Sequence, residues 1–361
     1  MKPIITLLFA SALVLAAEGF AQQESQAAAR RLVFSGMVDA DFASDYGALD
    51  EAHHLTGLEA DLTTQVLLNP RLYAVVRTTL RDGTVPRQGA GNTWTPLAFD
   101  GVQVNWKADD KTILMVGDLI GGSGYFQYYR YKRSAAVVGE HSLRGAGIRH
   151  GNLLVQAGMA TDSAGMRGDW SVFGRWTRAI RENVSWTPSL RYTLGVPGAL
   201  PFELGVSFDA GFEDVLELHA STGMQYWNPD TDPGTFVLVE PRYTMEPYFV
   251  AGTVFISDKG EVPSPNSPRS TLTWKPLDDC ILQAEPGMAL NKTFSTSVSL
   301  EYRNTSFNAG RDESFWFSPT LYVYPAARAQ WQLWTALTKP LINGDGSAPR
   351  LSLGSEIAFT F

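Results

Sequence analysis

One pattern recurs through most of this 361-residue chain: apolar and polar side chains alternate over about ten positions at a time. The segments 58–66, 72–81, 202–209 and 296–303 show it most clearly. A period of two places successive side chains on opposite faces of a β-strand. Strands of about ten residues exceed the usual five or six and match the length of a tilted strand that crosses a membrane. The alternation therefore predicts an all-β chain whose strands have one apolar face and one polar face.

The predicted connections between these strands are alternately short and long. The short ones are Leu68–Arg71, Ala108–Lys111, His150–Asn152, Ile180–Asn183, Phe212–Asp214, Asn291–Thr293 and Pro325–Ala327. The long ones are Ala43–His54, Asp82–Pro96, Ile120–His141, Asp258–Asp279, Asn304–Glu313 and Thr338–Ala348. Transmembrane barrels are organised in this way, with short turns at one end and longer loops at the other. A soluble β-sandwich has no reason to sort its loops by length.

Closure of the sheet follows from the membrane environment. In hydrocarbon every backbone N–H and C=O needs an internal partner, which a closed antiparallel barrel provides without helices. The runs between short turns give about 18 strands, an even number as in bacterial barrels. Pro188, Pro241, Pro286 and Pro319 fall inside predicted strands, where each removes a ladder hydrogen bond. We expect some of these prolines at bulges or strand ends, and 16 strands is the alternative.

Aromatic residues in the apolar register lie mostly toward the predicted strand ends. They are Trp106, Trp170, Trp176, Trp186, Trp331, Tyr192 and Tyr243. Such positions are typical of the aromatic girdles that lie at the two membrane interfaces.

The first 21 residues have the features of a secretory signal peptide. Lys2 supplies the positive start, a mostly apolar run follows from Ile4 to Ala17, and Gly19–Ala21 offers small residues for cleavage after Ala21. The run is too short for a membrane anchor, which needs about 20 apolar residues. We therefore divide the chain into a signal peptide (1–21), a short polar segment (22–30) and a single barrel domain (31–361).

Several classes of function are not expected. The formal net charge is −8 and no basic stripe stands out, which argues against a nucleic-acid partner. Cys280 is the sole cysteine, so no intrachain disulfide forms, and no basic neighbour activates its thiol. The five histidines form no cluster with metal-ligand spacing, and the glycines of 121–124 lack the helix and spacing of a phosphate cradle. We expect no metal and no cofactor.

The last predicted strand carries the most specific signal. Apolar residues from Leu351 to Phe359 alternate with polar ones, apart from Ser355 in the apolar row, and Phe361 is the final residue. This segment resembles the terminal strand of Gram-negative outer-membrane porins, which the barrel-assembly machinery recognises by alternate apolar residues and a final aromatic. The resemblance implies that Phe359 and Phe361 form an assembly signal. It also implies an exported outer-membrane barrel, embedded in lipid, through which small polar solutes diffuse passively.

The loop 120–141 is the candidate constriction. It follows roughly the fifth strand, and in the porins that the chain resembles the third long loop folds inward to narrow the pore. Aromatic and basic side chains in it could offer stacking surfaces and positive charge to a sugar or an anionic solute. These residues are Tyr125, Tyr128, Tyr129, Arg130, Tyr131, Lys132 and Arg133. The alternative is one more strand with aromatic and basic residues at the lipid interface.

Charged residues in the polar register are expected to line the lumen. The acidic ones include Asp39, Asp41, Glu59, Asp61, Glu203, Asp209, Glu217, Glu240, Glu301 and Glu356. The basic ones include Arg77, Arg81, Arg175, Arg191, Arg242, Arg303, Arg328 and Arg350. A basic loop opposite acidic wall groups would set a transverse field that favours polar solutes. The alternative is that these charges pair with one another in a wet lumen.

There are three alternatives to a porin-like channel. A non-conducting adhesin or structural barrel would use its long loops to bind partners. His219 and Ser221 lie on one strand face, as in an outer-membrane phospholipase, but the register turns them inward beside Glu217. Acidic and histidine pairs, such as Asp61 with His53, resemble those of outer-membrane proteases only weakly. We therefore expect no enzyme. Porins often form trimers, but the sequence does not establish a homotrimer.

Overall fold

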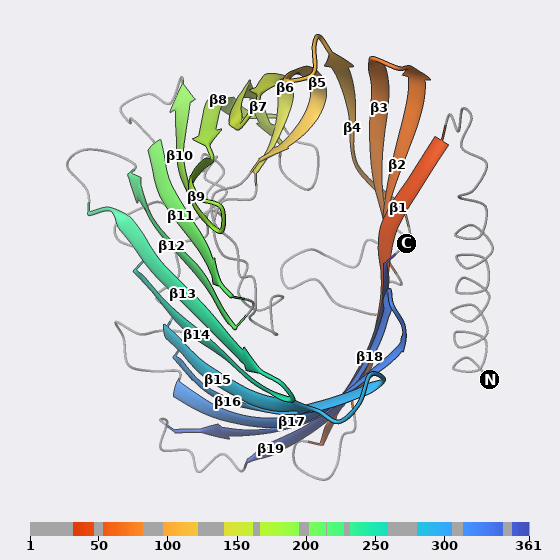
Figure 1. The fold of residues 1–361 in the computed structure, drawn as a ribbon, viewed down its shortest axis with the longest axis vertical. Coiled ribbons are helices and arrows are strands. Elements are labelled where there is room, and N and C mark those ends of the chain that lie inside the picture. The colour runs from red at the N-terminus through yellow and green to blue at the C-terminus, as the bar shows by residue number, and fades with distance from the viewer. Residues whose placement is uncertain are drawn as a thin grey trace.

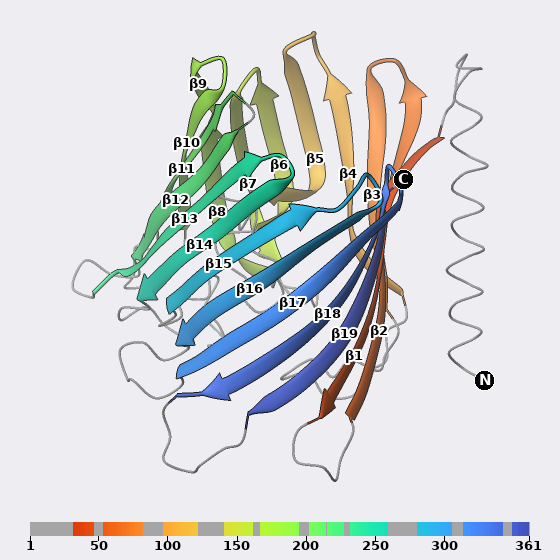
Figure 2. The ribbon, with the colours of Figure 1, turned by 60° about the horizontal axis from the view of Figure 1, so that its bottom comes forward.

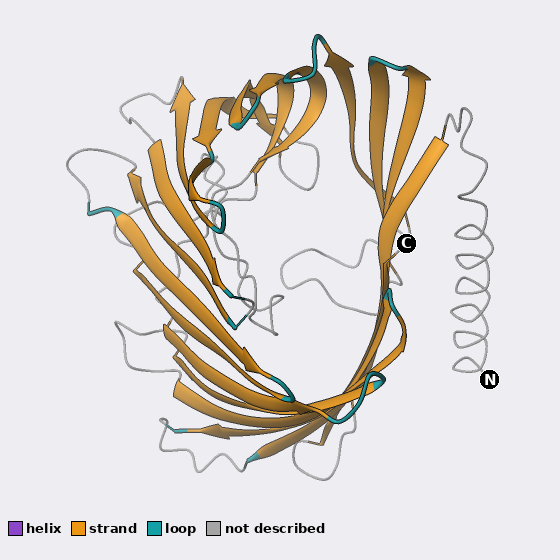
Figure 3. Cartoon of the chain, in the orientation of Figure 1, coloured by secondary structure: helices purple, strands orange, loops and turns teal. Residues whose placement is uncertain are grey.

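A computed structural model describes residues 32–46, 53–81, 97–121, 141–161, 167–194, 202–213, 215–226, 232–258, 280–304, 313–341 and 349–360. Every regular element in these ranges is a strand (Figure 3). The elements are β1 (Leu32–Tyr46), β2 (His53–Asn69), β3 (Leu72–Arg81), β4 (Leu97–Lys107), β5 (Thr112–Gly121), β6 (His141–His150), β7 (Leu153–Thr161), β8 (Arg167–Trp176), β9 (Arg178–Arg181), β10 (Val184–Leu194), β11 (Phe202–Phe212), β12 (Leu216–Tyr226), β13 (Gly234–Met245), β14 (Tyr248–Asp258), β15 (Cys280–Ala289), β16 (Phe294–Asn304), β17 (Glu313–Ala326), β18 (Ala329–Pro340) and β19 (Arg350–Thr360).

The strands form one antiparallel sheet that returns to its first strand. Successive strands pair along the chain, with β8 and β9 both pairing with β10, and β19 pairs in turn with β1, from Met37 opposite Thr360 to Tyr46 opposite Leu351. Figure 1 shows the strands following one another around this ring, and Figure 2 shows their common tilt. A sheet that closes on itself has no unpaired edge. The transmembrane antiparallel barrel predicted from the sequence is confirmed.

β8 and β9 are two parts of one strand, so the barrel has 18 strands, the larger of the two predicted numbers. The strand is interrupted at Thr177, between the pair Arg175–Ser189 and the pair Arg178–Trp186 on β10. Pro188 of β10 lies opposite this interruption and has no N–H to donate across it. Pro188 therefore lies at an irregularity, as expected.

The other three prolines lie inside their strands and cause no bulge. Pro241, Pro286 and Pro319 each keep a partner in one neighbouring strand. With the neighbouring strand on its other side, each proline forms no residue pair. The register between the two strands is nevertheless the same before and after the proline. Each proline therefore costs the sheet a local ladder gap rather than a bulge, and the strand continues.

Connection length depends on the end of the barrel. The turns after β2, β4, β6, β9, β11, β13, β15 and β17 have two to four residues, whereas the connections at the other end have five to twenty-one. We call these the short-turn end and the loop end. Most of these connections agree with those predicted from the sequence; the turn Glu246–Pro247 and the connections 162–166, 195–201 and 227–233 were not predicted.

A repeated side-chain motif closes three of the short turns. Asn69, Asp109 and Asn291 each accept hydrogen bonds from the backbone N–H groups two and three residues ahead, at 2.8–3.0 Å. Asn and Asp side chains favour turns because their oxygens can replace a backbone acceptor in this way. The motif fixes where each of these strand pairs begins.

Burial is inverted relative to a soluble protein. Many large apolar side chains point away from the barrel axis and are exposed, such as Val116 (60%), whereas polar side chains of the opposite row, such as Glu240, are fully buried. A soluble sandwich would bury the first set and expose the second. An outward apolar surface is the side that lipid would cover. No helix among the described residues is long and apolar enough to cross a membrane.

Exposed aromatic side chains gather toward the short-turn end. Trp106, Phe212, Tyr243, Tyr248 and Trp331 all lie within a few residues of a short turn and are exposed. This is the position of an aromatic girdle at one membrane interface.

Candidate functional site

The inward-facing side chains form the candidate functional surface, and this surface has two unlike parts. On β5–β8 it carries a buried apolar cluster, which we call the apolar arc. Its members are Ile113, Met115, Leu119, Leu143, Leu154 and Phe173. On β10–β17 the inward row is mostly polar, and we call it the polar arc. The sequence predicted a polar face throughout, so the apolar arc is a departure.

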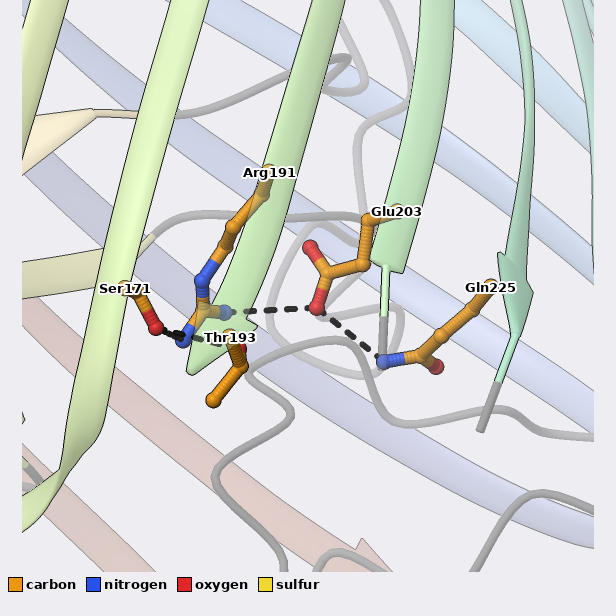
Figure 4. Close-up of polar contacts among 5 residues, drawn as sticks. All are labelled: Ser171, Arg191, Thr193, Glu203 and Gln225. Atoms are coloured by element: carbon orange, nitrogen blue, oxygen red, sulfur yellow. Dashed lines mark hydrogen bonds and ion pairs between the residues drawn. The ribbon is translucent and has the colours of Figure 1, made fainter. Parts of the chain in front are cut away.

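The first network of the polar arc centres on Arg191 of β10, which is 2% exposed (Figure 4). Its guanidinium donates to Glu203 Oε1 at 3.2 Å and to Ser171 Oγ at 3.3 Å. Gln225 Nε2 donates to the same Glu203 oxygen at 3.1 Å, and the Ser171 and Thr193 hydroxyls lie 3.0 Å apart. A buried charge is tolerated when it is paired and hydrogen-bonded. Here Arg191 and Glu203 neutralise each other across neighbouring strands.

A second network spans β14–β17 and centres on Glu285, which is 5% exposed. Glu285 Oε1 accepts from Ser297 Oγ at 2.6 Å and from the Tyr322 hydroxyl at 2.7 Å. Glu285 Oε2 accepts from Gln283 Nε2 at 3.3 Å, and the same nitrogen donates to Ser299 Oγ at 3.0 Å. This network joins its strands through hydroxyl and amide groups around one carboxylate.

The short-turn end of the polar arc is more open. His219 is buried, and its Nδ1 lies 2.7 Å from Oδ1 of Asp209, whose side chain is 44% exposed. Glu217 and Arg242 are directly opposite each other on β12 and β13, and both are exposed. A hollow of about 260 Å³ lies here, with Arg181, Asp209 and Glu217 in its lining. Both signs of charge therefore face solvent at this mouth.

No protein-family model matches the sequence, and no curated protein matches it. Solved structures do match. OccAB4 of Acinetobacter baumannii has a TM-score of 0.56 and 10% identity, covering 92% of this chain and 98% of its own. OccK8 (OprE) of Pseudomonas aeruginosa has a TM-score of 0.56 and 9% identity, covering 91% and 98%. The chain has the fold of a Gram-negative outer-membrane porin.

A third similar structure is OmpT, an outer membrane protein of Vibrio cholerae in a trimer form. Its TM-score is 0.50 and its identity 11%, covering 91% of this chain and 99% of its own. At such identities the likeness concerns the porin fold alone.

The structure brings several predicted lumen residues together on the inner wall. Arg191 is buried against Glu203, whereas Arg175, Glu217 and Arg242 lie on the inward row and are exposed. Glu240 and Glu301 are also buried on the inward row of the polar arc. Arg77 donates to Gln103 Oε1 at 2.9 Å across β3 and β4. The buried pair Arg191–Glu203 favours the alternative in which wall charges neutralise one another, while the short-turn mouth keeps exposed charges.

Other predicted residues lie outside the described part. Asp39, Asp41, Glu59, Asp61 and Arg81 are on strands whose side chains at these positions are not described. The same holds for Phe359, Glu356 and Arg350 in β19, and Phe361 follows the last described residue. The candidate constriction residues Tyr125, Tyr128, Tyr129, Arg130, Tyr131, Lys132 and Arg133 all lie in 122–140, outside the described residues.

Sequence reasoning missed most uncharged members of the two networks. Thr193, Gln225, Gln283 and Tyr322 share the parity of the charged inward residues, so the period-two register could have found them. It missed the apolar arc for a different reason. In 112–120 apolar residues occupy both parities, and alternation cannot say which of two apolar rows faces inward.

Proposed function

We propose that this protein is an outer-membrane channel for the passive diffusion of small polar solutes. The observation that supports the proposal is the distribution of side chains on a closed sheet, in which β19 pairs with β1. Its outward face is apolar, and its inward face is largely polar along β10–β17. A surface of that kind is stable in lipid only when its inward groups meet water or one another. An 18-stranded barrel has room for an aqueous lumen, as porins of 16 to 18 strands do.

The proposed constriction is the loop 120–141. Its basic and aromatic residues provide charge and stacking surface, and its ends continue β5 and β6, two strands of the apolar arc. If the loop narrows the pore, its positive charge shapes the local field. Replacing Arg130, Lys132 and Arg133 together by glutamine should then shift ion preference toward cations, whereas an unchanged preference would remove the loop from the mechanism.

The proposed route to the membrane begins with cleavage of residues 1–21 by signal peptidase. Phe359 and Phe361 then present the last strand to the barrel-assembly machinery. The exposed apolar row contacts outer-membrane lipid, and the outer-membrane trimer of similar fold makes a homotrimer a reasonable assembly to test. Neither a cofactor nor catalysis forms part of this proposal.

The experiment that tests the channel is single-channel recording of the refolded protein in a planar bilayer, with the reversal potential measured under a salt gradient. Discrete, steady openings are expected, and the sign of the reversal potential reports which charges dominate the narrowest part. A folded barrel that never conducts would contradict the proposal and favour the adhesin or structural alternative.

A further inference from the structure

We propose that the network around Glu285 binds a small monovalent inorganic cation such as Na⁺ or K⁺. The starting point is the unusual position of this carboxylate. Glu285 is on the inward row of β15 and is 5% exposed, so water reaches it poorly. An ionised carboxylate removed from water needs compensation, either from a cation or from several hydrogen-bond donors.

The donors around Glu285 are all neutral. They are the hydroxyls of Ser297 and Tyr322 and the side-chain amide of Gln283. No cationic side chain among the described residues forms an ion pair with it. The contrast is Glu203, also buried, which faces the Arg191 guanidinium at 3.2 Å. A buried carboxylate on one side of the polar arc therefore has a cationic partner, whereas Glu285 on the other side has only neutral donors among the described residues.

The oxygens of this network can accept further contacts. A carboxylate has about four lone-pair directions, and Glu285 uses three, two on Oε1 and one long contact on Oε2. Ser318 provides the second, independent sign. It lies directly opposite Ser299 on the next strand, is 0% exposed, and its hydroxyl has no hydrogen-bond partner in the described part of the chain. Buried hydroxyls are rarely left unpaired, so the position calls for a partner.

The ligand class follows from the donors. Carboxylate and hydroxyl oxygens are ligands for hard cations. One carboxylate balances one positive charge, and the described residues contain no group of three or more His, Cys, Asp or Glu suited to a metal ion. Deep burial excludes a bulky organic ammonium. A dehydrated monovalent ion, held by Glu285 Oε2 and the Ser299 and Ser318 hydroxyls, fits these conditions.

The test measures the thermal unfolding midpoint of the refolded full-length protein in lipid or detergent, with enough urea to bring the transition into range. The probes are NaCl, KCl and N-methylglucamine chloride at equal ionic strength. A cation that binds the folded barrel raises the midpoint. We expect a midpoint a few degrees higher in NaCl or KCl than in N-methylglucamine chloride, and loss of that difference in Glu285→Gln.

The matched control is Glu203→Gln, which removes a buried carboxylate that already has a cationic partner. It should lower the midpoint in every salt but keep the difference between salts. Equal midpoints of the unmodified protein in all three salts would overturn the proposal, as would a difference that survives in Glu285→Gln. If Glu285→Gln fails to fold, Ser318→Ala decides: a reduced difference supports the site and an unchanged one contradicts it. The readout requires a folded barrel only, so it is independent of conduction.

Discussion

The apolar arc and the polar arc belong to one sheet and face the same interior, yet they are stabilised differently. On β5–β8 side chains such as Leu119 and Leu143, both 0% exposed, belong to one cluster of buried apolar residues. On β10–β17 buried groups such as Arg191 and Glu285 depend on partners in neighbouring strands. Apolar packing tolerates some rearrangement, whereas a buried polar network fails when one member is removed. The two arcs should therefore respond differently to substitution.

The largest effect is expected at the charge pair of the polar arc. Arg191→Gln leaves Glu203 buried without its cation, and losing one partner of a buried pair costs about 3–5 kcal/mol. Urea unfolding of the lipid-embedded protein measures this loss. The double variant Arg191→Gln/Glu203→Gln should recover part of it because no lone charge remains. A single variant as stable as the parent would mean that the pair contributes nothing.

A somewhat smaller loss is expected in the apolar arc. Leu143→Ala removes a fully buried side chain and should cost about 2–5 kcal/mol in the same assay. The matched control is Val116→Ala on the outward row, where the side chain is 60% exposed and lipid can fill the space. Equal losses at the two positions would show that the inward cluster is not packed as described.

Substitution of one glycine in each arc allows a finer comparison of the two arcs. A Cβ at Gly145 of β6 would meet the backbone oxygen of Ala157 at 2.0 Å, whereas one at Gly287 of β15 would meet the end of the Phe249 ring at 2.1 Å. A ring can swing aside and a strand backbone cannot. Overpacking costs about 1–3 kcal/mol, so we expect Gly145→Ala near the top of that range and Gly287→Ala near the bottom. The reverse order in urea unfolding would contradict the strand geometry at β6.

The smallest effect concerns the turn that leads into the apolar arc. The backbone N–H of Lys111 and the hydroxyl of Thr112 donate to Asp109 and hold its pKa below the usual value. A lowered pKa stabilises the fold above the pKa of the unfolded chain, about 3.9, and this contribution is lost as the pH falls through the lower folded value. Asp109→Asn keeps the turn, as Asn69 and Asn291 show, but should remove that part of the acid sensitivity. The measurement is the free energy of unfolding in urea as a function of pH. If it changed identically for parent and variant between pH 5 and pH 2, this role of Asp109 would be contradicted.

Much of this fold could be predicted from the sequence because a membrane barrel has one dominant constraint. Each strand must present one apolar row to lipid. The barrel, the number of strands and most of the turns could be predicted from these rows. The interior has no equivalent rule. The contacts of Arg191 or Glu285 depend on which strands are neighbours and on their register. The sequence also could not say which prolines, such as Pro286, interrupt a ladder without changing its register. The apolar arc was missed because packed side chains, as well as water, can occupy an interior.

The most direct test of the central claim, that the polar row faces a conducting lumen, is thiol modification during single-channel recording. In a Cys280→Ser background, Glu217→Cys places a thiol on the exposed inward row and Val237→Cys places one on the exposed outward row. A membrane-impermeant, negatively charged thiol reagent should cause a stepwise fall in conductance with Glu217→Cys and no change with Val237→Cys. Equal responses, or a response at Val237→Cys alone, would contradict the assignment of lumen and lipid faces.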